Sequence, residues 1–185
     1  MANYKDNPVL TDAELPRLTI ITPCYERAEF VNLMLCNLAN FDYPKEKLEW
    51  AVLQDGPTDL FASYGGEESI RKAMHPIKLV YKYEKGVRRT IGEKRNILIK
   101  KMATSKYVAM MDSDDIYFPT YPRYAVSTLV KNKMGIVGSQ SMLFCYPYHN
   151  YEMAAISCAS KRQIHEGCSV LSLKHFRSTG GFQKS

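Results

Sequence analysis

The sequence lacks the segments that place a protein in or across a membrane. No apolar run approaches the roughly 20 residues that a helix needs to cross a bilayer. Residues 1–16 are polar and contain no apolar core of the kind that a signal peptide has. These absences predict a soluble protein of the cytoplasm without a transmembrane segment.

Cysteine is also scarce, and its spacing excludes two common small-domain frameworks. There are five cysteines, an odd number, and no two follow a C-x-x-C spacing, which argues against a zinc ribbon and against a disulfide framework. Most have apolar neighbours, so we expect them to pack as small hydrophobic side chains in a reducing compartment. They are Cys24, Cys36, Cys145, Cys158 and Cys168.

The chain contains no internal repeat and no low-complexity segment. Its 185 residues suit one domain, and the proportions of hydrophobic (45%) and charged (24%) residues are those of a globular protein rather than a disordered one. The formal net charge of +6 suits an anionic ligand. It also suits nucleic acid, a membrane surface or a solvated basic surface, so charge alone does not identify the partner.

Short apolar or β-branched runs alternate with segments whose apolar residues recur at helical spacing. Such alternation predicts an α/β fold with a mainly parallel sheet flanked by helices. Residues 1–17 precede the first run and are predicted to be an N-terminal extension. The strands are expected over residues 18–21, 48–53, 77–83, 107–111, 135–144 and 169–173, and the helices over residues 28–40, 93–103, 121–131 and 174–178.

Polar clusters follow three of the expected strands, at residues 22–27, 54–59 and 112–115. In open parallel sheets, ligands bind in the crevice outside the carboxyl ends of the strands. The three clusters therefore predict one binding site, formed where these strand ends meet.

The acidic cluster Asp112-Ser113-Asp114-Asp115 follows its strand without a spacer. If the chain stays extended, Asp112 and Asp114 point to the same side and repel each other unless something neutralises them. A hard divalent cation with oxygen ligands does so, and magnesium or manganese keeps positions open for a diphosphate. The alternative is a polar turn in which one aspartate caps the following helix.

Two other acidic motifs were compared with this cluster. A calcium loop of the EF-hand type fits poorly, because Tyr117 stands where glycine is needed and Arg123 where glutamate is needed. A haloacid-dehalogenase-like phosphatase also places Asp-x-Asp after an apolar strand. Ile116 occupies the place where threonine or valine is usual. Because of this departure, the hydrolase, with Asp112 as nucleophile, is kept as the enzymatic alternative.

Four motifs together resemble one enzyme family. They are TIITPCYER at residues 19–27, QDGPTD at 54–59, GEKRN at 92–96 and DSDD at 112–115. Their order and spacing resemble the family-2 inverting glycosyltransferases with the GT-A fold, and the resemblance covers residues 18–123 well. A fainter likeness is to the glycosyltransferase domains of large algal viruses, for which the compartment would be the host cytoplasm.

The resemblance implies a Rossmann-like GT-A domain over residues 18–185, within a longer protein that has other domains. Its nucleotide-binding half would span about residues 18–118 and its acceptor-side half about residues 119–185. The implied reaction moves a hexose from a UDP-sugar, such as UDP-glucose, to a hydroxyl of a carbohydrate or glycan acceptor with inversion. The implied cofactor is a divalent metal, manganese or magnesium, and no nucleic acid is involved.

The resemblance also implies roles for single residues. Thr22, Pro23 and Tyr25 would line the uracil and ribose pocket, and Asp55 would hydrogen-bond the uracil. Asp114 would hold the metal that bridges the phosphates, with Asp112 and His165 as further candidate ligands. The implied nucleotide-sugar-binding residues are Thr22, Pro23, Tyr25, Glu26, Asp55, Lys94, Arg95, Asp112 and Ser113.

The general base is the weakest part of the resemblance. The family's base follows a Gly-Gly-Phe-like stretch, and here no acid follows Gly180-Gly181-Phe182 before Ser185. Glu166 is the nearest carboxylate and, with Asp114, is the candidate catalytic residue; an ordinary loop acid is the alternative. The family also often has asparagine where Glu26 stands.

A basic cluster near one loop is compatible with this chemistry. A diphosphate leaving group develops negative charge that cations stabilise; the alternative is a solvated loop. The cluster consists of Lys85, Arg88, Arg89, Lys94 and Arg95. A non-catalytic nucleotide-sugar or carbohydrate binder remains a third hypothesis, whereas nucleic-acid binding calls for a basic helix or an aromatic-basic sheet face, and this is not the pattern here.

Overall fold

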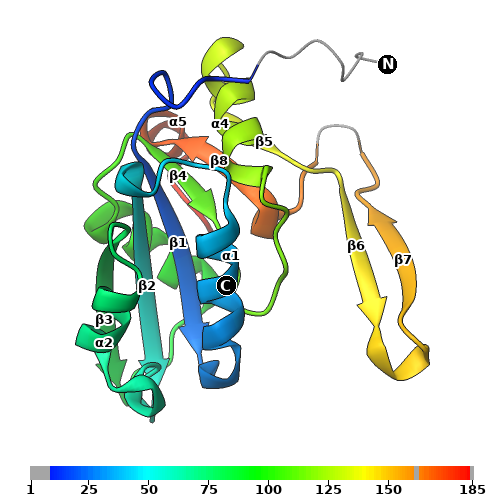
Figure 1. Ribbon diagram of the computed structural model, residues 1–185. Helices are drawn as coiled ribbons and strands as arrows, with labels where there is room; N and C mark the ends of the chain where they lie inside the picture. Colours follow the sequence, from blue (N-terminus) through cyan, green and yellow to red (C-terminus); the bar gives the residue numbers. More distant parts are fainter. Residues whose placement is uncertain (1–8, 161–162, 184–185) are drawn as a thin grey trace.

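A computed structural model describes residues 9–160 and 163–183 and contains one six-stranded sheet as its framework (Figure 1). The strand order is β3-β2-β1-β4-β8-β5; β3, β2, β1 and β4 are parallel, and β8 runs antiparallel to both β4 and β5. The strands are β1 (Leu18–Tyr25), β2 (Leu48–Gly56), β3 (Lys78–Lys85), β4 (Tyr107–Met110), β5 (Ile136–Gly138) and β8 (Ser169–Ser172). The predicted α/β fold with a mainly parallel sheet is confirmed.

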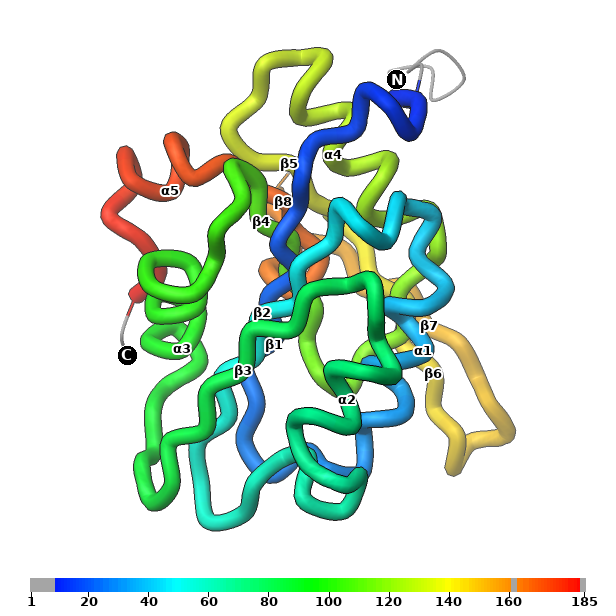
Figure 2. The backbone as a smooth tube through the Cα atoms, turned by 60° about the vertical axis from the view of Figure 1, so that its left-hand side comes forward, coloured from blue at the N-terminus to red at the C-terminus, as the bar shows by residue number. Residues whose placement is uncertain are grey.

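Helices cover both faces of the sheet. Helices α1, α2 and α4 lie on one face, and α3 and α5 lie on the other (Figure 2). Apolar side chains of α1, α2 and α4 pack in the first layer, and those of α5 and a π-helical segment pack in the second, with Ile97 of α3. The α-helices are α1 (Val31–Asn40), α2 (Glu67–Ala73), α3 (Ile91–Ile97), α4 (Tyr121–Lys131) and α5 (Leu173–Thr179). The π-helix is Leu98–Met102, and the 3₁₀ helices are Ala28–Phe30, Lys45–Lys47, Ala62–Tyr64, Pro147–His149 and Glu166–Cys168.

The central strands are apolar at nearly every position because both of their faces are buried. In β2, Trp50 and Val52 belong to the layer under α1, whereas Ala51 and Leu53 belong to the layer under α3. This alternation is the period of two that a strand imposes. A continuous apolar run therefore forms one strand with two buried faces.

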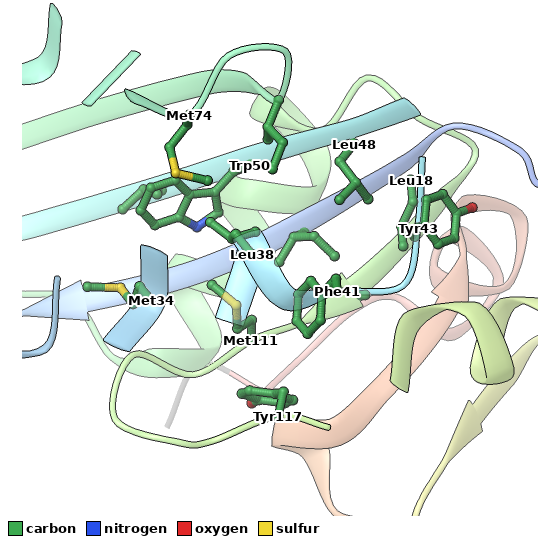
Figure 3. Packing of buried hydrophobic residues seen from close by; sticks show 14 of the residues in the cluster. Leu18, Met34, Leu38, Phe41, Tyr43, Leu48, Trp50, Met74, Met111 and Tyr117 are labelled. Carbon is green, nitrogen blue, oxygen red and sulfur yellow. The ribbon is translucent and has the colours of Figure 1, made fainter. Parts of the chain in front are cut away.

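Trp50 lies in the middle of the larger apolar layer, beside Met34, Leu38 and Met74 (Figure 3). Its ring packs on Phe61 with centroids 5.9 Å apart, and its Nε1 donates a hydrogen bond to Thr22 Oγ1 at 3.0 Å. The hydroxyl of Thr22 is consequently engaged in the core, although Thr22 belongs to the first predicted strand-end cluster.

The segment before β1, predicted to be an N-terminal extension, packs against the domain over its described part. Leu10 and Leu15 are buried in the layer that contains Trp50. Leu10 N donates to Ser127 Oγ at 2.9 Å, and Lys47 Nζ donates to the Leu15 carbonyl at 2.8 Å. Residues 1–8 of the predicted extension lie outside the described residues.

The predicted strand over residues 135–144 is wrong as a single element. It divides into β5, which joins the main sheet, and β6 (Ser141–Tyr146), which pairs with β7 (Glu152–Ser157) in a separate hairpin. Ser139 marks the break, because its hydroxyl bonds the backbone of Ser141 in place of a neighbouring strand.

Two other expectations from the sequence need correction. Helix α2 has one buried residue, Ile70, so its apolar periodicity was too weak to predict it. Most cysteines do not pack as core residues: of the five, Cys24 alone is buried, whereas Cys36 and Cys145 are exposed. No helix in the described ranges is both long enough and apolar enough to cross a bilayer.

We predict that Leu15→Ala lowers the free energy of unfolding by about 2–4 kcal/mol, because it removes a buried side chain and leaves a cavity. The measurement is equilibrium unfolding in urea. Val9→Ala, in the same segment but with an exposed side chain, is the matched control and should change stability by less than about 0.5 kcal/mol. Equal effects of the two substitutions would contradict the proposed packing of this segment.

Candidate functional site

The carboxyl end of β1 and the segment after β4 meet around an open hollow of about 800 Å³, and no residue of the cluster that follows β2 lines it. The start of α3 and the loop before it complete the wall. The lining residues are Pro23, Tyr25, Glu26, Arg27, Arg88, Arg89, Thr90, Ile91, Glu93, Lys94, Asp112, Ser113 and Asp114. A smaller hollow of about 270 Å³, between the π-helix and α5, has no carboxylate in its lining, so the larger one is the candidate site.

The two aspartates of the Asp-x-Asp motif both line the hollow but have different partners. Arg95 Nη2 donates to both carboxylate oxygens of Asp112, at 3.1 Å each. Asp114 lies 3.7 Å from Arg27 Nη2, and its side chain is 45% exposed, against 24% for Asp112. Strand β4 ends at Met110, so the motif lies in a turn rather than in the extended conformation considered above. Asp114 is therefore the more accessible carboxylate.

Asp115 belongs to the wall of the turn. Its backbone carbonyl accepts a hydrogen bond from Asn37 Nδ2 at 2.9 Å, and Asn37 Oδ1 accepts one from Tyr117 N at 3.1 Å. Burial, together with the charges of Asp112 and Asp114, raises the pKa of the Asp115 carboxyl. Asn37 of α1 thus fixes the backbone that follows the motif.

Helix α3 is attached to the sheet by a buried ion pair. Lys94 Nζ donates to Asp55 Oδ1 at 2.7 Å and to the Cys24 carbonyl at 2.9 Å, and Arg89 N donates to Asp55 Oδ2 at 2.6 Å. Asp55 is fully buried and Lys94 is 5% exposed. A capping box between Thr90 and Glu93 starts the helix here. The Asp55 carboxylate lies behind the hollow.

We predict that Lys94→Met lowers the free energy of unfolding by about 3–5 kcal/mol, because it leaves the buried Asp55 carboxylate without its cation. Urea denaturation of this variant, of Asp55→Asn and of the double variant gives the coupling between the two residues. The double variant should lose less than the sum of the single losses. Lys82→Met, at an exposed pair with Glu84, is the control and should cost less than about 1 kcal/mol; an equally small loss for Lys94→Met would contradict the account.

The guanidinium of Arg88 stacks on the ring of Tyr25. The Arg88 guanidinium carbon lies 3.5 Å from the ring centroid. Gly56, with φ of +115°, lets the strand end pass close to this ring, because a Cβ there would lie 3.1 Å from Tyr25 Cε2. The ring predicted to line the uracil and ribose pocket is therefore in the hollow, and Arg88 occupies one of its faces.

The other predicted site residues are distributed between the hollow and its surroundings. Pro23, Glu26 and Ser113 line the hollow. His165 Nε2 lies 3.3 Å from the carbonyl oxygen of Ile156, in the hairpin. The Glu166 side chain is 65% exposed, and its carboxylate pairs with Arg95 Nη1.

Three residues near the motif had no role assigned from the sequence. Arg27 lies beside Asp114, and its place in the first motif was a usable signal. Tyr117 OH accepts a hydrogen bond from Asp112 N at 2.8 Å and donates one to the Gly167 carbonyl at 2.6 Å. No sequence pattern links Tyr117 with Gly167, which lies 50 residues further along the chain.

A divalent metal fits the site only together with a ligand. Within residues 9–160 and 163–183, no three His, Cys, Asp or Glu side chains are grouped so as to hold a metal ion. Magnesium is usually held by one or two carboxylates together with substrate phosphates and water. The half-exposed carboxylate of Asp114, with Asp112 two residues away, matches that donor set.

The fold and the strand-end motifs define a glycosyltransferase domain of the GT-A type. The sequence matches Glycosyl transferase family 2 over residues 19–182, and the chain belongs to that family. A curated relative, an uncharacterized glycosyltransferase of Haemophilus influenzae, is 29% identical over 173 residues, which cover 75% of this chain and 51% of the relative. The chain thus spans about half the length of that relative. The predicted family is confirmed, and membership favours the glycosyltransferase hypothesis over the phosphatase-like one.

Solved structures with the same fold support this assignment. The mannosyltransferase PcManGT from Pyrobaculum calidifontis, in complex with GDP-Man and Mn²⁺, has a TM-score of 0.68 and 24% identity, over 96% of this chain and 50% of its own. S. aureus TarS 1-349 in complex with UDP-GlcNAc has a TM-score of 0.64 and 15% identity, over 90% of this chain and 48% of its own. At these identities the likeness establishes the fold.

Proposed function

We propose that this domain binds a UDP-sugar with manganese or magnesium and transfers the hexose to an acceptor hydroxyl with inversion. The observation that carries the proposal is the hollow itself, in which the accessible Asp114 carboxylate lies 3.7 Å from Arg27 Nη2. Arg27, Arg88 and Arg89 all line this hollow, and we name them the basic rim. PcManGT, of the same fold, is seen with a sugar nucleotide and Mn²⁺, and TarS with UDP-GlcNAc. GDP is therefore the second nucleotide to test after UDP.

The nucleobase is proposed to lie on the Tyr25 side of the hollow. Pro23 and Tyr25 line this side, and Arg88 stacks on the tyrosine ring. An incoming base can lie over the guanidinium or displace it from the ring, because both a cation and an aromatic base bind a π-face. Asp55, fully buried and already accepting two hydrogen bonds, contributes through the position of Lys94.

The diphosphate is proposed to lie between the acidic motif and the basic rim. Asp114 would hold the metal, with Asp112 beside it and the sugar or ribose near Asp112. The metal, when bound, supplies electrostatic stabilisation of the leaving diphosphate. Arg27, Arg88 and Arg89 line the same hollow and add positive charge where the leaving oxygen becomes negative.

In the proposed reaction the acceptor oxygen bonds to the anomeric carbon as the bond from that carbon to the diphosphate oxygen breaks. The acceptor proton passes to a carboxylate base, and the nucleoside diphosphate leaves with the bonding electron pair. Glu166 is the candidate base among the described residues, but its carboxylate is paired with Arg95. Asn96 fixes Phe182 through two backbone hydrogen bonds, of 2.9 and 3.0 Å, so an acid supplied after Phe182 in a longer chain would start beside α3.

We predict that Asp114→Asn lowers the affinity for UDP in the presence of Mn²⁺ by more than about 100-fold, beyond the roughly 10- to 100-fold typical of outer-shell changes. Isothermal titration calorimetry of UDP and GDP, each with and without Mn²⁺, is the measurement. Asp42→Asn is the matched control, because Asp42 pairs with Arg123 away from the hollow. Metal-dependent binding that is unchanged in Asp114→Asn would refute this assignment of the metal site.

A further inference from the structure

Arg95 joins two acids that lie far apart in the sequence. Its Nη2 donates to both oxygens of Asp112, and its Nη1 pairs with Glu166. The arginine side chain is only 3% exposed, whereas that of Glu166 is 65% exposed. Glu166 lies in the segment of residues 164–168, which we name the strap. One buried guanidinium therefore connects the strap with the first aspartate of the acidic motif.

Two further contacts fix the strap against the same aspartate. The hydroxyl of Tyr117 bridges the Asp112 backbone N–H and the Gly167 carbonyl. A Cβ at Gly167 would lie 2.7 Å from Asp112 Oδ2, so a side chain there would have to displace the Asp112 carboxylate. Since the φ of Gly167 is not in the left-handed region, the close approach to Asp112, rather than backbone conformation, is what favours glycine.

The strap is also tied to the edge of the sheet. His165 N donates to the Ser139 carbonyl at 2.9 Å, and Ser169 Oγ donates to the Glu166 carbonyl at 3.0 Å. These bonds connect the strap with the residues that follow β5 and begin β8. The strap is therefore held at one end by residues next to β5 and β8, and it contacts Asp112 through Arg95 and Gly167.

The hydrogen bonding of Arg95 shows which contacts determine its position. Its Nε is buried and has no hydrogen-bond partner within the described residues. Leaving such a donor unpaired typically costs about 1–3 kcal/mol. The hydrogen bonds that fix the side chain are therefore those of Nη1 and Nη2 with the two carboxylates, while Nε stays unpaired.

We propose that Arg95 is a positioning residue that orients the Asp112 carboxylate and seats the strap beside it, so that the donor site has its shape before a ligand arrives. Glu166 is then a counter-ion of Arg95 and an anchor of the strap. The expected consequence, tighter binding of the metal–nucleotide complex, rests on the proposed function. The seating of the strap is a property of the free protein and is tested separately.

The test uses two variants that disturb the Asp112 carboxylate, one by changing Arg95 and the other by changing the strap. Arg95→Lys removes the forked contact, because lysine cannot bridge two carboxylates in this geometry. Gly167→Ala leaves the core untouched and places a methyl group against Asp112. Arg177→Lys, at an exposed arginine, controls for the first variant. Gly66→Ala controls for the second, since a Cβ there meets nothing within 4 Å but its φ of +83° costs stability.

The first readout is calorimetric titration of UDP with Mn²⁺, supported by the electron paramagnetic resonance signal of bound Mn²⁺. We expect a loss of about 10- to 100-fold in affinity for Arg95→Lys and Gly167→Ala, and no change for either control. A purely structural role would lower the melting temperature, as we expect for Gly66→Ala, and leave the affinity of the folded protein unchanged. That result would overturn the proposal.

The second readout is amide hydrogen–deuterium exchange of residues 164–168 in the free protein. We expect faster exchange in Arg95→Lys than in wild type and Arg177→Lys, because the strap has lost one of its anchors. Unchanged exchange would overturn the seating of the strap. If wild type binds neither UDP nor GDP with Mn²⁺, the proposed function fails, and the exchange experiment still decides whether Arg95 seats the strap.

Discussion

Two neighbouring cations of α3 neutralise the acids at the ends of two strands, and the rest of the site depends on these contacts. Lys94 pairs with Asp55 of β2, and Arg95 pairs with Asp112 after β4. Without these two cations the carboxylates would be uncompensated, and one of them is fully buried, where an unpaired charge is costly. With the helix in place, Asp114 remains the accessible acid of the motif. The same contacts that hold the fold together thus leave one carboxylate available in the hollow.

This arrangement divides the charged residues between two tasks. The buried pair fixes the backbone of the site, and the partly exposed arginines around the hollow provide a positive field for an anionic ligand. An excess of positive charge over the whole chain did not distinguish a nucleotide from other anions, but its location at the carboxyl ends of parallel strands does favour a nucleotide. Family membership and the shared fold lead to the same class of protein.

The sequence predicted the elements whose physics is local. Strands such as β2 can be predicted from the sequence because both faces are buried and most of the residues are apolar, and the three strand-end clusters followed from that pattern. Helix α2 was missed because it buries a single residue, and the β6–β7 hairpin because its side chains are largely exposed and carry no alternation. The strap was beyond prediction, since its meaning depends on Arg95 and Tyr117, which reach it from distant parts of the chain.

The most direct measurement is a crystal structure of this domain grown with UDP and Mn²⁺, with anomalous diffraction recorded to locate the metal. The account predicts one anomalous peak at coordinating distance from the Asp114 carboxylate, the diphosphate between that ion and the arginines of the rim, and the uracil ring beside Tyr25. Nucleotide and metal bound outside this hollow, or a metal held without Asp114, would contradict the account.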